Sequence, residues 1–369
     1  MRVALVALHF AEYASRLALA LAQDHSVLLV LRTDNATSEL SESLREALDK
    51  NVKLVLIEHR QLRQIGVISA AISLVRVVQS FRPDVVHFQE YPVDYLAWAG
   101  LWLMQRFPSV VTIHDHESHS GLDSKSPWRF RYYRKLLRQR ADRIIVHGET
   151  IRLALANDLT ISNKPVFSIM HGALGTDGAG CELTHAPDIR TLLFFGRIEA
   201  YKGLPVLLDA IDILNAEGKV KVRLIIGGKG SALEPLRARI VANPNIELID
   251  RYISADEIPA LFHRSGVVVL PYLDATQSGV AAIAFAYGRP VIASNTGALP
   301  EVVRNNETGL LVPPADARSL AQSIHKLVSD RDLWTNLAVG ALRLAHSDLS
   351  WPRIAILTGR VYETLANDV

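Results

Sequence analysis

Residues 191–205, TLLFFGRIEAYKGLP, join a short apolar run to a basic loop bounded by glycines and then to a second apolar run. Thr191–Phe195 has the continuous apolar character of a strand buried on both faces, and Leu204–Asn215 has helical spacing. Such strand–loop–helix units bind ligands at the carboxyl ends of their strands. Arg197 and Lys202 lie in this loop, where guanidinium, ammonium and backbone N–H groups would bind a diphosphate. The alternative is two solvated loop cations.

Short apolar runs separated by helix-length spacers recur on both sides of this stretch. Their alternation predicts an α/β fold with parallel sheets. A glycine-rich segment, 171–180, and a polar stretch to Asp188 interrupt the pattern and predict a linker. The expected strands are Val3–Leu8, Ser26–Leu31, Val52–Glu58, Val85–Gln89, Ser109–His114, Arg143–His147 and Val166–Met170 before it, and Thr191–Phe195, Val222–Ile226, Ile246–Ile249, Val267–Leu270, Pro290–Ala293 and Gly309–Val312 after it.

Composition is that of an ordinary globular protein. The 369 residues are 49% hydrophobic and 21% charged, with a net charge of +2 that gives no support to nucleic-acid binding. The single cysteine, Cys181, can form neither an internal disulfide nor a metal cluster, which favours a reducing compartment. The short apolar start reads as a strand and not as a signal peptide, and no apolar run is long enough to span a bilayer. We therefore expect a cytoplasmic protein.

An ordered set of motifs in the second half gives a family resemblance. Gly196-Arg197 with Lys202-Gly203, Pro271-Tyr272, Ser278-Gly279, the stretch AYGRPVIAS at 286–294, TGALPE at 296–301 and NETGLLV at 306–312 resemble the donor site of retaining GT-B glycosyltransferases of family 4. The likeness is close over residues 188–350. In the first half it is weaker, and rests on Asp84–His87, Thr112–Asp115 and His171-Gly172.

This resemblance implies two Rossmann-like domains facing across a cleft: residues 1–180 for the acceptor and 181–350 for a nucleotide-sugar donor. A final helix within 351–369 would cross back to the first domain. It also implies retention of anomeric configuration, with no cofactor and no obligatory metal. The implied reaction-centre residues are His114, Arg197 and Lys202. The implied substrate-binding residues are Gly196, Asp274, Gln277, Ser278, Gly279, Glu301 and His87.

Each role has a physical reason and a plainer alternative. Fixed cations at Arg197 and Lys202 would stabilise the charge that develops on the leaving diphosphate. His114 ends an apolar strand and should face the cleft, although a strand-end histidine is more often structural. Ser278 before an apolar run could expose backbone N–H groups to an oxygen ligand or could simply cap a helix.

One family feature is absent. The family has two glutamates with seven residues between them, and here the corresponding positions are Ala275 and Ile283. Asp274 is a candidate to replace the first glutamate, Gln277 could hydrogen-bond a sugar hydroxyl, and nothing obvious replaces the second glutamate. The turn after the first strand, around His9, also lacks the glycines that let a backbone approach phosphate closely.

Residues 128–140, WRFRYYRKLLRQR, mix cations and aromatics at helical spacing. Arg131, Arg134, Lys135 and Arg138 would form one cationic stripe. Such a helix suits an anionic membrane surface or the diphosphate of a lipid-linked acceptor. The alternative is a solvated amphipathic helix.

The leading hypothesis is a retaining glycosyltransferase that moves a sugar from a nucleotide-diphosphate sugar to a lipid-linked glycan at the cytoplasmic membrane face, in bacterial surface polysaccharide synthesis. The missing glutamates keep open a non-catalytic GT-B protein that binds or scaffolds another transferase. A third alternative is another GT-B enzyme, such as a nucleotide-sugar epimerase or a glycosyl phosphorylase.

Overall fold

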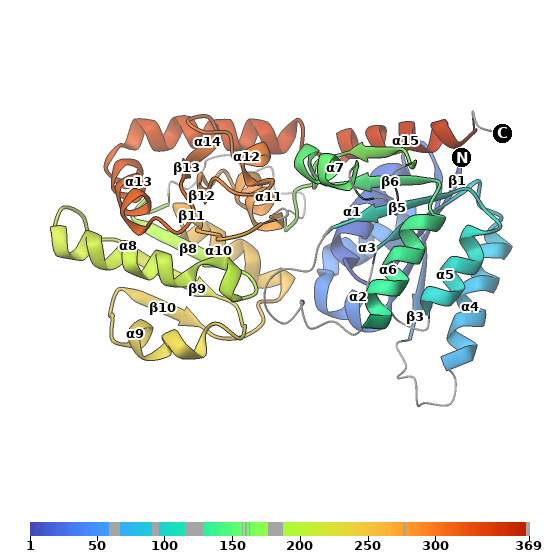
Figure 1. Cartoon of the computed structure of the whole chain (residues 1–369), viewed down its shortest axis with the longest axis horizontal. Coiled ribbons are helices and arrows are strands. Elements are labelled where there is room, and N and C mark those ends of the chain that lie inside the picture. Colours follow the sequence, from blue (N-terminus) through green and yellow to red (C-terminus); the bar gives the residue numbers. More distant parts are fainter. Residues whose placement is uncertain are drawn as a thin grey trace. The chain divides into compact units, whose positions relative to one another are not determined.

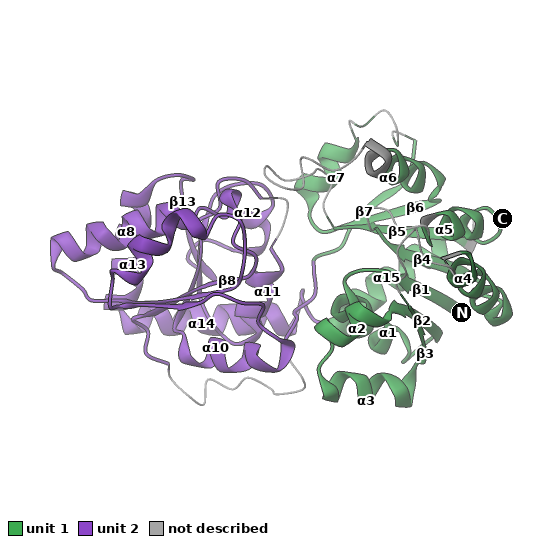
Figure 2. Cartoon of the chain, turned by 90° about the horizontal axis from the view of Figure 1, so that it is seen from below, with its two compact units in different colours: residues 1–116, 126–170, 351–369 green, residues 117–125, 171–350 purple. Residues whose placement is uncertain are grey.

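The computed structural model describes residues 1–58, 67–90, 96–114, 128–156, 158, 161, 163–175, 187–275 and 278–366. The chain divides into two compact units, coloured separately in Figure 2. Unit 1 contains residues 1–116, 126–170 and 351–369, and unit 2 contains residues 117–125 and 171–350. Each has a parallel sheet with helices, so the predicted pair of Rossmann-like domains is confirmed. The change of unit comes at His171, the first residue of the glycine-rich segment.

The seven strands of unit 1 pair in parallel in the order β3-β2-β1-β4-β5-β6-β7. Most are runs of buried aliphatic side chains, because helices cover both faces of the sheet. Each coincides within one or two residues with an apolar run expected from the sequence. The strands are β1 (Arg2–Ala7), β2 (Ser26–Arg32), β3 (Lys53–Ile57), β4 (Val85–Gln89), β5 (Ser109–Ile113), β6 (Arg143–Val146) and β7 (Val166–Ser168).

The helices of unit 1 lie on two sides of this sheet. Apolar side chains of α4 (Val67–Phe81), α5 (Leu96–Met104) and α6 (Trp128–Arg140) form one core with Val86 and Val111 of the central strands. Side chains alternate along a strand, so His87 and Thr112 face the other side. Further helices of the unit are α1 (Ala11–Leu21), α2 (Thr33–Glu39), α3 (Glu42–Asn51), α7 (Glu149–Ala156) and α15 (Trp351–Ala366), labelled in Figure 1.

The C-terminal helix α15 belongs to unit 1, as expected. It packs against α1, where the rings of Tyr13 and Trp351 lie 5.2 Å apart. Arg143 of β6 donates hydrogen bonds to the side chain and the carbonyl oxygen of Thr364, at 2.9 and 3.0 Å. The helix is therefore joined to unit 1 by apolar and polar contacts.

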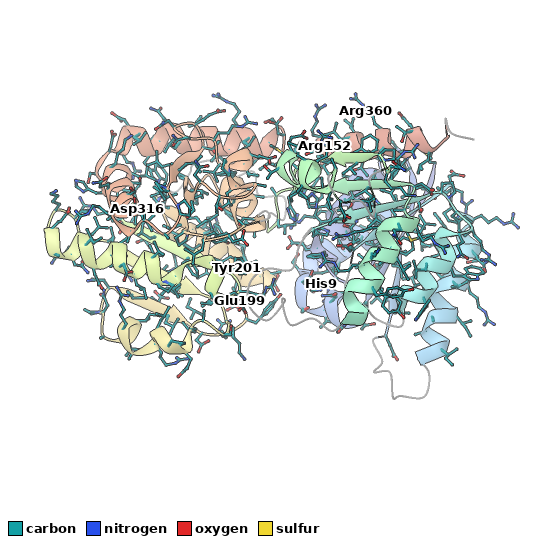
Figure 3. The ribbon with its side chains drawn as sticks, viewed as in Figure 1. His9, Arg152, Glu199, Tyr201, Asp316 and Arg360 are labelled. Carbon is teal, nitrogen blue, oxygen red and sulfur yellow. The ribbon has the colours of Figure 1, made fainter. Side chains whose placement is uncertain are left out.

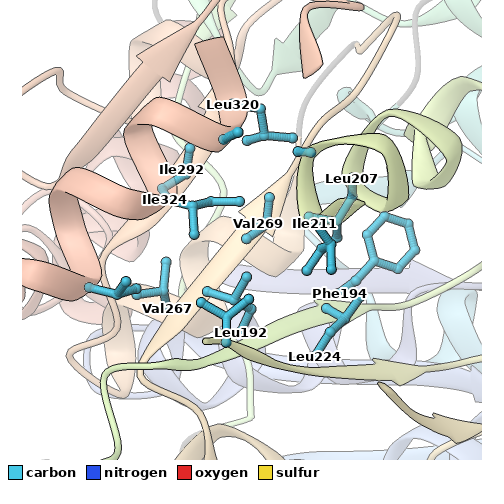
Figure 4. Packing of buried hydrophobic residues seen from close by; sticks show 14 of the residues in the cluster. Leu192, Phe194, Leu207, Ile211, Leu224, Val267, Val269, Ile292, Leu320 and Ile324 are labelled. Atoms are coloured by element: carbon cyan, nitrogen blue, oxygen red, sulfur yellow. The ribbon is translucent and has the colours of Figure 1, made fainter. Parts of the chain in front are cut away.

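Unit 2 has a six-stranded parallel sheet in the order β10-β9-β8-β11-β12-β13. In its core, shown in Figure 4, Leu192 and Val269 pack with Leu207 and Ile211 of one helix and Ile324 of another. Its strands are β8 (Thr191–Phe195), β9 (Arg223–Gly227), β10 (Ile246–Ile249), β11 (Val267–Leu270), β12 (Val291–Ser294) and β13 (Gly309–Val312). Its α-helices are α8 (Leu204–Glu217), α9 (Arg237–Val241), α10 (Ile258–Arg264), α11 (Gly279–Ala286), α12 (Leu299–Val302), α13 (Ala317–Ser329) and α14 (Arg331–His346), with short 3-10 turns η2 (Ala200–Lys202), η3 (Glu234–Leu236) and η4 (Ala255–Glu257).

Strand order positions the candidate sites. In unit 1, β1 lies between β2 and β4, and in unit 2, β8 lies between β9 and β11. The chain reverses its direction of winding at these strands, and the loops at their carboxyl ends diverge to leave room for a ligand. The loops after β8 and β11 therefore lie side by side. None of the described helices combines the length and apolar composition needed to cross a bilayer.

Candidate functional site

The segment after β8 is held in place by two glycines. Gly196 and Gly203 have φ angles of 106° and 67°, a backbone conformation that other residues seldom adopt. A Cβ on Gly203 would lie 1.9 Å from the carbonyl oxygen of Pro271. The backbone N–H of Leu273 donates to the carbonyl oxygen of Tyr201 at 2.7 Å. The basic segment is thus fixed against the loop that follows β11, and Tyr201 is labelled there in Figure 3.

Lys202 is buried, with 8% of its surface exposed, although it carries a charge. Its ammonium nitrogen lies 3.1 Å from the position that a Cβ on Gly196 would occupy. The same nitrogen lies 5.3 Å from the centre of the Tyr272 ring, a distance at which the ring face attracts a cation. Arg197, by contrast, is exposed. The two residues predicted to bind diphosphate therefore lie in one short segment, with Lys202 buried and Arg197 at the surface.

Tyr272 and Ser278 adjoin these cations. Burial raises the pKa of Tyr272 to about 12, although the Ser278 hydroxyl and the positive charge of Arg197 oppose that shift. The two hydroxyl oxygens are 3.5 Å apart, at the limit of hydrogen bonding. The Ser278 side chain makes no cap hydrogen bond to α11, so the capping alternative is wrong. A Cβ on Gly279 would lie 3.9 Å from Nε2 of His171, a residue that sequence reasoning used only for the resemblance.

The altered turn before α11 has no carboxylate in its buried part. Ala275 and Ile283 are buried with 5% and 6% of their surfaces exposed, and Asp274 is exposed. Ile283 packs 3.6 Å from the position of a Cβ on Gly175. Gln277 lies outside the described residues. Glu301 is half-buried on the short helix α12.

In unit 1, His114 follows β5 directly and is buried, with 2% exposed. Its Nε2 lies 2.8 Å from Oε1 of Gln89. The Phe10 ring stacks on the imidazole with centroids 3.8 Å apart, and Tyr13 and His147 approach it at 4.9 and 4.8 Å. Phe10 has a φ of 61°, a strained conformation for a bulky residue. The glycine-free turn is thus stabilised by aromatic contacts to the predicted reaction-centre histidine.

The N-terminus of α1 is capped by a carboxylate of this chain. Oε2 of Glu39 accepts a hydrogen bond from the backbone N–H of Glu12 at 3.4 Å, and Asn35 donates to Oε1 at 2.6 Å. His9 also contacts Asn35, with its Nδ1 3.3 Å from Oδ1. Burial raises the pKa of Glu39 to about 7, and the nearby carboxylates of Glu12 and Asp34 add to the shift. An acid of unit 1 itself therefore occupies the start of α1, next to the turn that lacks glycines.

Because of this raised pKa, we expect the stability of the protein to decrease as the pH rises. Glu39 moves from a reference pKa of 4.5 to about 7 on folding, so the folded protein retains a proton that the unfolded chain loses between these values. The unfolding free energy should decrease by up to about 3 kcal/mol as pH rises through that window. Glu39→Gln should abolish the decrease, whereas Glu42→Gln at an exposed position should retain it. Denaturant titrations at pH 5 and pH 8 measure both; an equal decrease in parent and Glu39→Gln contradicts the assignment.

His87 is a structural residue, so its predicted substrate-binding role is wrong. It is fully buried, its Nδ1 lies 2.7 Å from the Tyr362 hydroxyl, and its Nε2 lies 2.7 Å from the Thr112 hydroxyl. Burial lowers the pKa of His87 to about 3, which keeps the ring neutral. Both ring nitrogens are engaged inside unit 1.

The cationic stripe on α6 is also corrected. Arg138 is buried and donates to both carboxylate oxygens of Glu90 at 2.6 and 2.9 Å, and Arg134 donates to Oε2 at 3.2 Å. Glu90 follows β4 and is 5% exposed. Lys135 is exposed, and the side chain of Arg131 lies outside the described residues. The residue spacing placed four cations on one helix face. Two of them, Arg134 and Arg138, bind the buried carboxylate of Glu90 instead of facing solvent.

Comparison with known proteins gives the family. Residues 11–173 match the family described as Glycosyltransferase Family 4, and residues 189–330 match Glycosyl transferases group 1. A glycogen synthase from Mycobacterium tuberculosis is 30% identical over 294 residues, which cover 77% of this chain and 69% of that protein. The chain belongs to the family 4 and group 1 glycosyltransferases. The family resemblance seen in the sequence is confirmed.

Other similarities of this glycosyltransferase are more distant or partial. A D-inositol 3-phosphate glycosyltransferase from Streptomyces bingchenggensis is 31% identical over 198 residues, which are 51% of this chain and only 43% of that protein. A sucrose-phosphate synthase from Thermosynechococcus elongatus matches over 100% of both chains, with a TM-score of 0.76 at 20% identity. Anabaena Alr3699/HepE, solved with UDP-glucose, matches 99% of this chain and 100% of its own, with a TM-score of 0.71 at 16% identity. These structures establish the GT-B fold.

Proposed function

We propose that this glycosyltransferase transfers a sugar, with retention of configuration, from a nucleoside-diphosphate sugar to a lipid-linked glycan. The observation that carries the proposal is the segment after β8, which holds Arg197 and the buried Lys202 at the carboxyl edge of the unit 2 sheet. A structural neighbour, Alr3699/HepE, was solved with UDP-glucose, a donor of this chemical class.

The proposed roles of Lys202 and Arg197 follow from the charges that develop during transfer of the sugar. Breaking the bond between the sugar carbon C1 and the diphosphate leaves positive charge on the sugar and negative charge on the departing phosphate. The ammonium of Lys202 is already desolvated and fixed beside Gly196 and Tyr272, so it needs little reorganisation to stabilise that charge. Arg197 adds a planar fork for phosphate oxygens from the exposed side. We assign His114 to contact with the reacting sugar or acceptor.

The direct test is a screen of nucleoside-diphosphate sugars with mass detection of products, run with and without lipid-linked acceptors. Transfer only in the presence of acceptor supports the proposal. An isomer of the nucleotide sugar formed without acceptor identifies an epimerase, and sugar 1-phosphate formed from a glycan and inorganic phosphate identifies a phosphorylase. The buried Ala275 and Ile283 favour the non-catalytic alternative, for which we expect no thermal stabilisation by any nucleoside diphosphate or its sugar.

We also expect the transferase to work without a divalent metal ion. The proposed diphosphate ligands are cations, so they supply the charge that a divalent ion supplies in other transferases. Turnover should be unchanged, within about twofold, after treatment with EDTA and gel filtration. Loss of activity that returns with Zn²⁺ or Mg²⁺ contradicts metal independence. The His114–His147 pair, with centroids 4.8 Å apart, is then the first place in unit 1 to look for the ion.

The acceptor part of the proposal rests on one face of unit 1. The helices α4, α5 and α6 pack side by side, with α5 in contact with both neighbours, and their sequences contain no Asp or Glu. Lys135 and Arg140 are exposed on α6. Four large apolar side chains on these helices are also exposed: Ile68, Ile72, Trp98 and Tyr132. Cations beside exposed aromatics suit an anionic lipid surface, where a lipid-linked acceptor would be located.

Vesicle binding tests this face. Charge reversal of Lys135 and Arg140 to Glu should weaken co-sedimentation with vesicles containing phosphatidylglycerol, by at least about 2 kcal/mol, because two attractive charges are lost and two repulsive ones are added. Reversal of Arg223, exposed at the start of β9 in unit 2, is the matched control and should have little effect. Parental binding by the double variant, or binding insensitive to salt, contradicts the membrane assignment.

A further inference from the structure

A buried hydrogen-bonded chain runs along one face of the unit 1 sheet and ends at His114. Gln89 of β4 is opposite Thr112 of β5 in the parallel register. Because side chains alternate along a strand, His87 and Gln89 share a face with Thr112 and His114. The described residues also place Tyr362 of α15 on this face, through its contact with His87. The five side chains are 0–4% exposed, so water contributes little to their hydrogen bonding.

The contacts are continuous. The Tyr362 hydroxyl lies 2.7 Å from Nδ1 of His87, and Nε2 of His87 lies 2.7 Å from the Thr112 hydroxyl and 3.5 Å from the Gln89 amide nitrogen. The Gln89 amide oxygen lies 2.8 Å from Nε2 of His114. The two hydroxyls can each donate or accept, so they fit either tautomer of His87. Gln89 cannot adapt in this way, because its two ends have opposite hydrogen-bonding character.

The amide direction decides which nitrogen of His114 is protonated. With its NH₂ toward His87 and its oxygen toward His114, Gln89 can only accept at the second contact, so Nε2 of His114 must donate. The neutral ring then has its lone pair on Nδ1. Phe10, stacked at 3.8 Å, and Tyr13, edge-on at 4.9 Å, oppose a ring flip that would exchange the two nitrogens.

We infer that Gln89 is a positioning residue that holds His114 in the tautomer protonated at Nε2. Its consequence for catalysis rests on the proposed function: a ring in this state offers a substrate hydroxyl a hydrogen-bond acceptor at Nδ1 and not a donor. His87 lies next to the amide nitrogen of Gln89, and the hydroxyls of Thr112 and Tyr362 complete the hydrogen bonding of His87.

Nitrogen NMR tests the tautomer without any activity assay. In protein labelled with ¹⁵N-histidine, the signals of His114 are assigned by their loss in His114→Gln. We expect a protonated-type shift for Nε2 and an unprotonated-type shift for Nδ1. Gln89→Leu should average the two shifts, whereas Gln89→Glu, which also accepts at this position, should keep the protonated-type shift at Nε2. A protonated Nδ1 in the parent, or an unchanged pattern in Gln89→Leu, overturns the inference.

Activity then separates this inference from the proposed function. Gln89→Leu should lower kcat by about tenfold with the donor KM unchanged, and Gln89→Glu should restore part of the loss with a shifted pH profile. A Gln89→Leu variant with parental kcat despite averaged shifts overturns the catalytic consequence only. Parental turnover by His114→Ala contradicts the assigned role of His114 and leaves the tautomer result standing.

Discussion

Replacing Lys202 with alanine should reduce turnover by about 10²- to 10³-fold. In the proposed function the ammonium is fixed where negative charge develops on the leaving diphosphate, and it is buried beside Gly196, whereas the neighbouring cation Arg197 is exposed. Lys202→Met, which retains most of the apolar stem, should lose turnover to the same degree while its unfolding free energy stays nearer that of the parent. Steady-state kinetics and denaturant unfolding of both variants measure this separation.

Lys219→Ala is the matched control, because this lysine of unit 2 is 60% exposed and pairs with Glu217 at the surface. It should leave both turnover and stability near parental values. Parental turnover in Lys202→Ala would show that the ammonium does not act on the diphosphate. If Lys202→Met loses turnover only in proportion to its loss of folded protein, the role of Lys202 is structural and not catalytic.

The second large effect is on stability. Glu90→Leu should lower the unfolding free energy of the protein by about 3–5 kcal/mol, because it leaves the buried guanidinium of Arg138 without its carboxylate. The double variant Glu90→Leu/Arg138→Leu should recover part of that loss, since an apolar pair needs no charge compensation. Chemical denaturation of the two variants measures the difference.

An exposed ion pair gives the control for this prediction. Glu149 pairs with Arg152 at the surface of α7, and Glu149→Ala should leave the denaturation midpoint close to that of the parent. A Glu90→Leu variant as stable as Glu149→Ala would mean that the α6 cations are satisfied by solvent. The surface stripe predicted from the sequence would then be the better description of that helix.

The strands of both sheets were predictable because most are continuous apolar runs, which are the local mark of burial on both faces. The cation segment was predictable for a similar reason: glycines, Arg197 and Lys202 lie within a few residues of one another. The contact between this segment and Tyr272 could not be derived from spacing, because it depends on β8 and β11 being neighbours in the sheet. In the sequence, Tyr272 appeared only as part of a family motif.

Two errors and one missed feature have physical causes. The partner of His87 is Tyr362, 275 residues further along the chain, and no local pattern indicates it. Helical spacing placed Arg134 and Arg138 on one face, but it does not show what that face packs against. A signal was present in Glu90, an acid directly after a buried strand, which should have suggested a cationic partner. The left-handed backbone of Phe10 has no sequence signal, because propensity argues against it.

The return of α15 to unit 1 also constrains when that unit can be completed during synthesis. A ribosome releases the strands of unit 1 and then the whole of unit 2 before it makes Trp351–Ala366. Until then, His87 and Arg143 lack Tyr362 and Thr364, and the apolar surface beneath the helix is open. Unit 2 can therefore finish folding while the first-made unit still waits for its last helix. A chain interrupted before residue 351 should expose that surface to chaperones and proteases.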